Sequence, residues 1–368
     1  MPPFSSNPSL LSKSSDHHET LIHYPLSHPN QVPIVEDVEE EEEMKDDLVP
    51  EDEVHKPMDS VKPKTDQSFI YIDNSNWSIV WTNVIFFIIL HAVHIYGIYY
   101  LIKIKPYPSW IFSWFWGTWG GFGITAGAHR LWSHRSYKAR LPLRIFLMIG
   151  QTIAGQNNLY VWSRDHRVHH KFSETDADPH NSHRGFFFAH MGWLLFKKHP
   201  DVLKKGKTLD CSDLMKDPVV RFQVRYYYWL LLVWGMLIPW LVPVFLWNET
   251  LSGSFLINVI SRYVTSLHCT WFVNSTAHMF GNRPYNHKIG PCENLFVSYG
   301  AHGEGYHNYH HTFPYDYATS ELGFSLNITK VFIDTAAYFG LAYDLKRVSR
   351  SIIEKRKAAV EKALQVES

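Results

Sequence analysis

Residues 79–102, IVWTNVIFFIILHAVHIYGIYYLI, form an apolar run that is long enough to cross a bilayer as one helix. A KIKPY segment follows, and because Pro106 and Pro108 interrupt a helix, we expect the chain to reverse there as a helical hairpin. Trp and Tyr at the ends of such runs are typical of a membrane interface and argue against four buried helices of a soluble protein. Four runs reach spanning length: 79–102, 108–128, 226–247 and 254–276.

The chain is large, and its charged residues are unevenly distributed along the sequence. It has 368 residues, 45% of them hydrophobic, and a formal net charge of zero, which excludes nucleic-acid binding through a general basic field. Its three cysteines form no CxxC pair, so reduced thiols are expected rather than a disulfide framework. Residues 1–68 are polar and acidic without an apolar period and are predicted to be a disordered cytosolic tail. We expect residues 69–348 to form one domain and residues 349–368 to form a charged C-terminal tail.

The basic residues predict the orientation in the membrane. Two hairpins would put the N-terminal tail, the loop 129–225 and everything after residue 276 on one side. That loop is rich in Lys and Arg, which mark the cytoplasmic face, so both termini are expected in the cytosol. The fourth run carries Arg262 and His268, which are costly in a membrane unless they face a functional interior. The predicted fold class is an all-α membrane protein with four transmembrane helices and a helical cytosolic cap.

Histidines are concentrated in three short stretches, all predicted to lie on the cytosolic side: HRLWSH at 129–134, HRVHH at 166–170 and HNYHH at 307–311. Each residue of an α-helix turns about 100°, so the three histidines of either HxxHH stretch share one helix face. His129 and His134 would point about 140° apart on a straight α-helix. We therefore expect the second membrane helix to end or bend between them.

His278, with Asn274 one turn before it, supplies a further candidate ligand. Nine imidazoles exceed what one metal ion can use, which indicates two metals with four or five nitrogens each. Open, nitrogen-rich, paired sites suit iron and the activation of dioxygen, although geometry alone does not exclude zinc. Asn274 could reach a metal directly or through a water. The nine candidates are His129, His134, His166, His169, His170, His278, His307, His310 and His311.

Long motifs show a resemblance to a known family. GITAGAHRLWSHRSYKAR, RDHRVHHKFSETDADPHN, RGFFFAHMGWLL, TWFVNSTAHMFGNRPY, GEGYHNYHHTFPYDY and AYDLK follow one another in the order and spacing of the integral-membrane acyl-CoA desaturases of the stearoyl-CoA Δ9 type. The resemblance covers residues 68–348. It implies a four-helix stem in the endoplasmic reticulum membrane with a cytosolic di-iron cap, the nine histidines as iron ligands, and Asn274 holding a water. The implied reaction is the oxygen-dependent insertion of a cis double bond into a long-chain saturated acyl-CoA.

The resemblance also implies residues that position the substrate. Those that would hold coenzyme A, with Trp271 near the carbonyl end, are Asn83, Asn157, Arg164, Asp165, Lys197, Lys198 and Trp271. Those that would shape the acyl tunnel and its bend are Gln156, Trp162 and Thr270. Cations suit phosphates, but Lys197 and Lys198 would equally attract anionic membrane lipid. No haem-binding HPGG segment is present, so electrons are expected from cytochrome b5 and its NADH-dependent reductase.

Two departures from the family pattern leave the chain length of the substrate open. Gly117 stands where the family often has a bulky aromatic that closes the tunnel, and Gly121 follows one turn later. His302, in GAHGEG, replaces an expected apolar residue. Three other functions are considered: a di-iron membrane hydroxylase or lipid-linked desaturase, a zinc-dependent membrane hydrolase, and a non-catalytic lipid-binding relative.

Overall fold

The computed structural model describes residues 78–323 and 326–367, which belong to one compact unit. The predicted tail over 1–68 lies outside the described residues. Within them the chain is mostly helical, and the sheet has two short strands, β1 (Lys138–Ala139) and β2 (Ala342–Tyr343), paired antiparallel. The predicted all-α class is therefore confirmed for the part of the chain that the structure describes.

The first two apolar runs are helical and are joined by the short turn that the prolines predicted. Helix α1 (Trp81–Ile104) ends at Lys105, whose left-handed φ of 53° turns the chain, and Pro106 precedes α2 (Tyr107–Phe122). A π-helical segment, η3 (Gly123–Ser133), continues α2 without a break. Proline fits here because the first turn of a helix leaves its N–H groups unpaired in any case.

The other two runs are also helical, and each contains a π-helical segment. The third consists of α8 (Pro218–Leu230), η6 (Leu231–Leu237) and α9 (Ile238–Trp247). The fourth consists of α10 (Leu251–Ser254), η7 (Phe255–Ser261) and α11 (Arg262–Asn274). In length and composition, Trp81–Ile104 and Pro218–Trp247 are suited to cross a membrane. The count of four spans stays a prediction.

Arg262, the charged residue predicted to be costly inside the fourth run, is buried among backbone carbonyls. Its guanidinium donates to the carbonyl oxygens of Asn258 at 2.8 Å, Ile153 at 3.0 Å and Gly235 at 3.1 Å. Asn258 and Gly235 lie in the two π-helical segments η7 and η6. Arg262 therefore ties three helical segments together, and the hydrogen bonds offset the cost of burying its charge.

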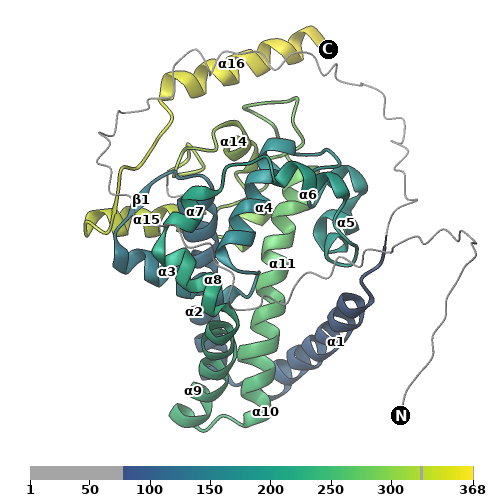
Figure 1. Ribbon diagram of the computed structural model, residues 1–368, viewed down its shortest axis with the longest axis vertical. Coiled ribbons are helices and arrows are strands. Elements are labelled where there is room, and N and C mark those ends of the chain that lie inside the picture. The colour runs from purple at the N-terminus through teal and green to yellow at the C-terminus, as the bar shows by residue number, and fades with distance from the viewer. Residues whose placement is uncertain (1–77, 324–325, 368) are drawn as a thin grey trace, which may run out of the picture. The chain divides into compact units, whose positions relative to one another are not determined.

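Short helices form the opposite end of the unit from α9 and α10 (Figure 1). The fully buried η3 packs against α3 and α4, and a Cβ on Gly123 would lie 1.9 Å from the backbone nitrogen of Gln151, so glycine permits this approach. The predicted C-terminal tail is largely one helix, α16. The elements are α3 (Leu141–Ala154), α4 (Leu159–Phe172), η4 (Ser182–Arg184), α5 (Phe186–His190), η5 (Gly192–Leu194), α6 (Pro200–Gly206), α7 (Ser212–Lys216), α12 (Thr276–Met279), α13 (Leu295–Gly300), α14 (His307–Thr312), α15 (Ile328–Tyr338) and α16 (Arg350–Glu367).

Candidate metal centre

The π-helical geometry of η3 brings His129 and His134 together. The backbone N–H of His134 donates to the carbonyl of His129 at 3.1 Å, the i to i+5 bond of a π-helix, so the two residues lie about one turn apart. Their ring centroids are 4.9 Å apart. The expected helix end is found at Ser133, immediately before His134, and the wider turn of η3 brings the two rings to the same side.

Five histidines from four segments converge in the first group, which we call the five-histidine group. The Nε2 atoms of His129 and His310 are 2.9 Å apart, and those of His134 and His166 are 2.8 Å apart. His170 completes it, with its Nε2 2.9 Å from that of His310. These members come from η3, the residue after it, α4 and α14: His129, His134, His166, His170 and His310.

The remaining four candidates form a second cluster, the four-histidine group: His169, His278, His307 and His311. The Nε2 atom of His307 lies 3.0 Å from that of His278 and 3.1 Å from that of His311. Each HxxHH stretch is divided between the two groups, because neighbouring residues on a helix point about 100° apart. His166 and His170 enter the five-histidine group, whereas His169 between them enters the four-histidine group.

The donor set fits two metal ions. Two nitrogens about 2.1 Å from one metal and at right angles are about 3.0 Å apart, whereas tetrahedral angles would separate them by about 3.4 Å. The nearest separations, 2.8 to 3.1 Å, are short enough for both nitrogens of a pair to bind one metal. Burial, then the neighbouring imidazoles, lowers the pKa of His134, His166 and His170 well below the ordinary value. This lowering favours the neutral form of these three imidazoles, which is the form that binds a metal.

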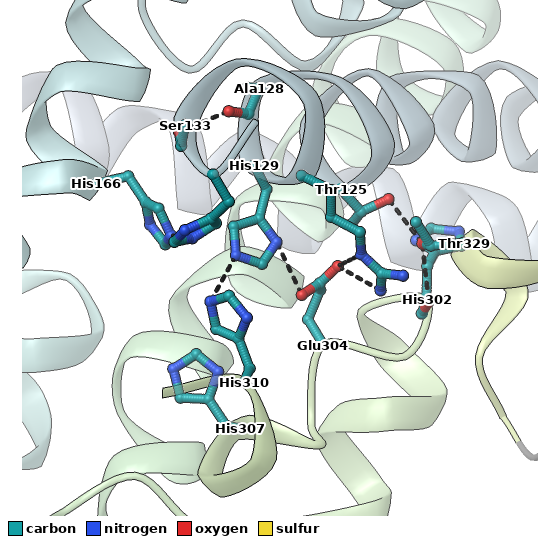
Figure 2. Close-up of polar contacts among 12 residues, drawn as sticks. Thr125, Ala128, His129, Ser133, His166, His302, Glu304, His307, His310 and Thr329 are labelled. Atoms are coloured by element: carbon teal, nitrogen blue, oxygen red, sulfur yellow. Dashed lines mark hydrogen bonds and ion pairs between the residues drawn. The ribbon is translucent and has the colours of Figure 1, made fainter. Parts of the chain in front are cut away.

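A carboxylate orients His129 from behind. The Nδ1 of His129 lies 2.9 Å from Oε2 of Glu304, whose other oxygen accepts from Arg130 at 2.9 Å (Figure 2). Burial alone would raise the pKa of Glu304, but Arg130 and His129 outweigh it and lower that pKa to about 2. The ionised carboxylate holds the proton of His129 on Nδ1 and leaves Nε2 free to face the group.

Two further carboxylates serve the four-histidine group. Asp178 accepts from Nδ1 of His169 at 2.9 Å, and Glu174 lies 3.6 Å from Nδ1 of His278. For Asp178, burial opposes ionisation, but His169, which lies beside it and is hydrogen-bonded to it, lowers its pKa overall. These two acids and Glu304 were not predicted as site residues from the sequence. The signal was present, because each acid lies within or beside a histidine-rich motif: KFSETDAD after HRVHH, and GEG before HNYHH.

A single cavity of about 580 Å³ begins at the histidines and extends between the membrane-facing helices. His129, His166, His169 and His307 line one end, and residues of α1 and α2 as far as Leu101 line the other. The other predicted site residues that line it are Gly117, Gly121, Trp162, Thr270 and Asn274.

The three residues predicted to bend the tunnel contact one another. Gln156 donates to the hydroxyl of Thr270 at 2.9 Å, and its carbonyl oxygen accepts from the indole N–H of Trp162 at 3.4 Å. The Trp162 ring stacks on His166, with centroids 5.1 Å apart. This cluster therefore stands where the cavity meets the five-histidine group.

Most residues predicted to hold coenzyme A also lie together. Asp165 pairs with Arg164 at 2.8 Å and with Lys198. The segment that carries Lys197 and Lys198 is bound to the start of α1, where Asn83 donates to the carbonyl of Leu194 at 2.7 Å. Trp271 is buried against Phe87 and His91, in the apolar cluster that also contains Leu194, and Asn157 is exposed on the turn before α4.

Comparison with known proteins gives the family. The sequence profile described as fatty acid desaturase matches residues 105–323. Stearoyl-CoA desaturase of Bos taurus is 52% identical over 314 residues, which are 85% of this chain and 83% of that protein. Two proteins of Acheta domesticus, an acyl-CoA Delta-9 desaturase and an acyl-CoA Delta12-desaturase, are 54% and 53% identical over 279 residues, in each case 76% of this chain and 78% of the relative. With its paired histidine groups and its cavity, the chain belongs to the fatty acid desaturase family.

Proposed function

We propose that the protein is an oxygen-dependent acyl-CoA desaturase that inserts a cis double bond at Δ9 into a long-chain saturated acyl-CoA. The observation that carries the proposal is the single apolar cavity that ends at two histidine groups. An acyl chain in it would be shielded from water and would run past both groups. The Δ12 relative is nearly as similar as the Δ9 relative, so regiochemistry must be read from products.

The nine histidines are proposed as ligands of two irons, with Asn274 holding a water beside one of them. When bound, the irons supply the activation of dioxygen that is needed to remove hydrogen from an unreactive methylene. The residues of the chain contribute position and charge. Glu304, Asp178 and Glu174 orient the imidazoles, and no side chain beyond the ligands is assigned an acid, base or nucleophilic role.

The substrate would be positioned at two places: charged residues would bind coenzyme A, and the apolar cavity would hold the acyl chain. Arg164, Lys197 and Lys198 supply cations for the phosphates of coenzyme A, and Asp165 holds two of the three in place. Trp162 and Thr270, joined by Gln156, would fix the bend of the acyl chain beside the five-histidine group. Asn83, Asn157 and Trp271 complete the proposed contacts.

The protein is proposed to lie in the endoplasmic reticulum membrane with four spans and both termini in the cytosol. Cytochrome b5 and its NADH-dependent reductase are the proposed electron donors. The Lys and Arg residues of the loop 129–225 support this orientation, because the histidine-rich segments then share the cytosolic side with soluble electron-donor domains.

The test is expression in a desaturase-deficient yeast, with the double bond located in cellular fatty acids by mass spectrometry. We expect cis Δ9 monoenes and growth without added unsaturated fatty acid. Hydroxylated chains without new double bonds would instead identify a hydroxylase. A purified protein that contains zinc and acts without oxygen would identify a hydrolase, and well-expressed protein with bound acyl chains but no product would identify a lipid-binding relative.

A further inference from the structure

His302 occupies the space that Gly121 leaves open. A Cβ built on Gly121 would lie 2.4 Å from Cε1 and 2.7 Å from Nδ1 of the His302 imidazole, so no side chain larger than hydrogen fits there while the ring is in place. Both residues line the cavity. The ring also packs against Phe122, with centroids 5.6 Å apart.

The backbone holds the ring at this place. His302 has a left-handed φ of 55°, and its carbonyl accepts from the N–H and the hydroxyl of Thr329 at 3.2 and 2.9 Å. The hydroxyls of Thr329 and Thr125 are 2.8 Å apart, which ties the loop to η3 (Figure 2). Two residues later the same loop carries Glu304, the partner of His129. The position of the ring is therefore fixed relative to the histidine groups.

The depth of the ring matches the distal part of an acyl chain. Gly121 lies eight positions before His129, a rise of at most roughly 12 Å, because the wider π-helical turns of η3 advance less per residue than an α-helix. An extended chain advances roughly 1.2 Å per bond, so the ring lies at most roughly ten bonds beyond the histidine end of the cavity. At that depth, a difference of two methylenes in the length of the acyl chain changes whether its end must pass the His302 ring.

We infer that His302 is a specificity-determining residue: its imidazole, seated against Gly121, narrows the acyl cavity and limits which saturated acyl chains pass to the space beside Gly117. Gly117 itself leaves that space open, because a Cβ there would meet only Cγ of Arg262, at 3.5 Å. The inference rests on the proposed desaturase function. The acyl cavity is then narrowed by His302, in the loop before α14, rather than by a large side chain on α2.

The test is the ratio of long to short monounsaturated products. The yeast strains receive equal amounts of saturated acids of fourteen to twenty carbons. His302→Ala should raise the ratio about tenfold, since one methylene in an apolar pocket is worth tenfold or more. Gly121→Ala should lower it, because its methyl displaces the ring into the cavity. In the variant that carries both Gly121→Ala and His302→Ala, the effect of Gly121→Ala on the product ratio should vanish, because the imidazole that its methyl would displace is absent.

Gly117→Ala is the matched control, since it adds a methyl to the same helix without touching His302, and its effect should add to that of His302→Ala. His302→Asn guards against misfolding, because Asn tolerates a left-handed φ, and it should shift the ratio in the same direction as Ala. An unchanged ratio in both His302 variants, or a Gly121→Ala effect that persists without the ring, would overturn the inference. A wild type that makes no unsaturated product would instead overturn the proposed function, and with it this inference.

Discussion

Replacing Asp178 with Asn should weaken metal binding at the four-histidine group and leave the five-histidine group intact. One oxygen of Asp178 accepts from Nδ1 of His169 at 2.9 Å and from the N–H of His180 at 3.1 Å. The other accepts from the N–H of Glu174 at 2.9 Å. An amide cannot accept at both positions, so its NH2 group must face a donor on one side. The charge is lost together with at least one hydrogen bond: that of Glu174 in one orientation of the amide, or those of His169 and His180 in the other.

The magnitude follows from the contact with His169. A hydrogen bond to a charged group contributes about 1.5–3 kcal/mol, and replacing such partners of metal ligands costs about 10- to 100-fold in affinity. The assay is metal content per chain, measured on detergent-purified protein during titration with a chelator. Wild type should release two metals over one range of chelator, whereas Asp178→Asn should release one metal at about 10- to 100-fold lower chelator concentration.

Asp176→Asn is the matched control. Asp176 lies two residues away, is 62% exposed, and pairs with Arg184 at 2.7 Å rather than with a histidine. It should release metal like wild type. If Asp178→Asn kept both metals with the wild-type chelator dependence, the carboxylate would not be orienting a ligand, and the reasoning from the contact between Asp178 and His169 would be refuted.

Three further outcomes are expected. His166→Ala and His310→Ala should each abolish desaturation while membrane insertion persists, as fractionation and product analysis would show; normal activity in either would contradict the di-iron assignment. Gly117→Phe should shorten the preferred acyl chain, because an aromatic ring there fills the cavity beyond His302, and an unchanged product profile would show that chains do not reach it. Arg262→Met should lower stability by about 2–4 kcal/mol, since it leaves buried carbonyls without donors; a melting temperature equal to that of wild type would contradict the role assigned to its three hydrogen bonds.

The helices and the candidate ligands could be predicted from short stretches of the sequence. Runs of about twenty apolar residues predicted four helical segments, and prolines marked the turn between the first two, because length and hydrophobicity are properties of contiguous residues. The number of clustered histidines, nine, likewise predicted two metals with four or five nitrogens each. Apolar runs and histidine-rich motifs are local features, which a sequence displays directly.

The sequence did not predict the π-helical segments. HRLWSH has no residue that requires a wider turn, and an α-helix would have pointed His129 and His134 about 140° apart. The i to i+5 bond between them forms where η3 is completely buried between α3 and α4. Packing against other segments therefore decided the local helical type.

What the sequence by itself determined was composition and period: the apolar runs, the proline turn, and nine histidines on one predicted side of the membrane. Only the tertiary structure decided how those histidines divide, which carboxylates orient them, and which ring narrows the cavity. The physical reason is that these contacts join residues far apart in the chain, such as His129 and His310, and Gly121 and His302. Such pairs carry no shared period, and they meet only when burial of the apolar runs brings their helices together.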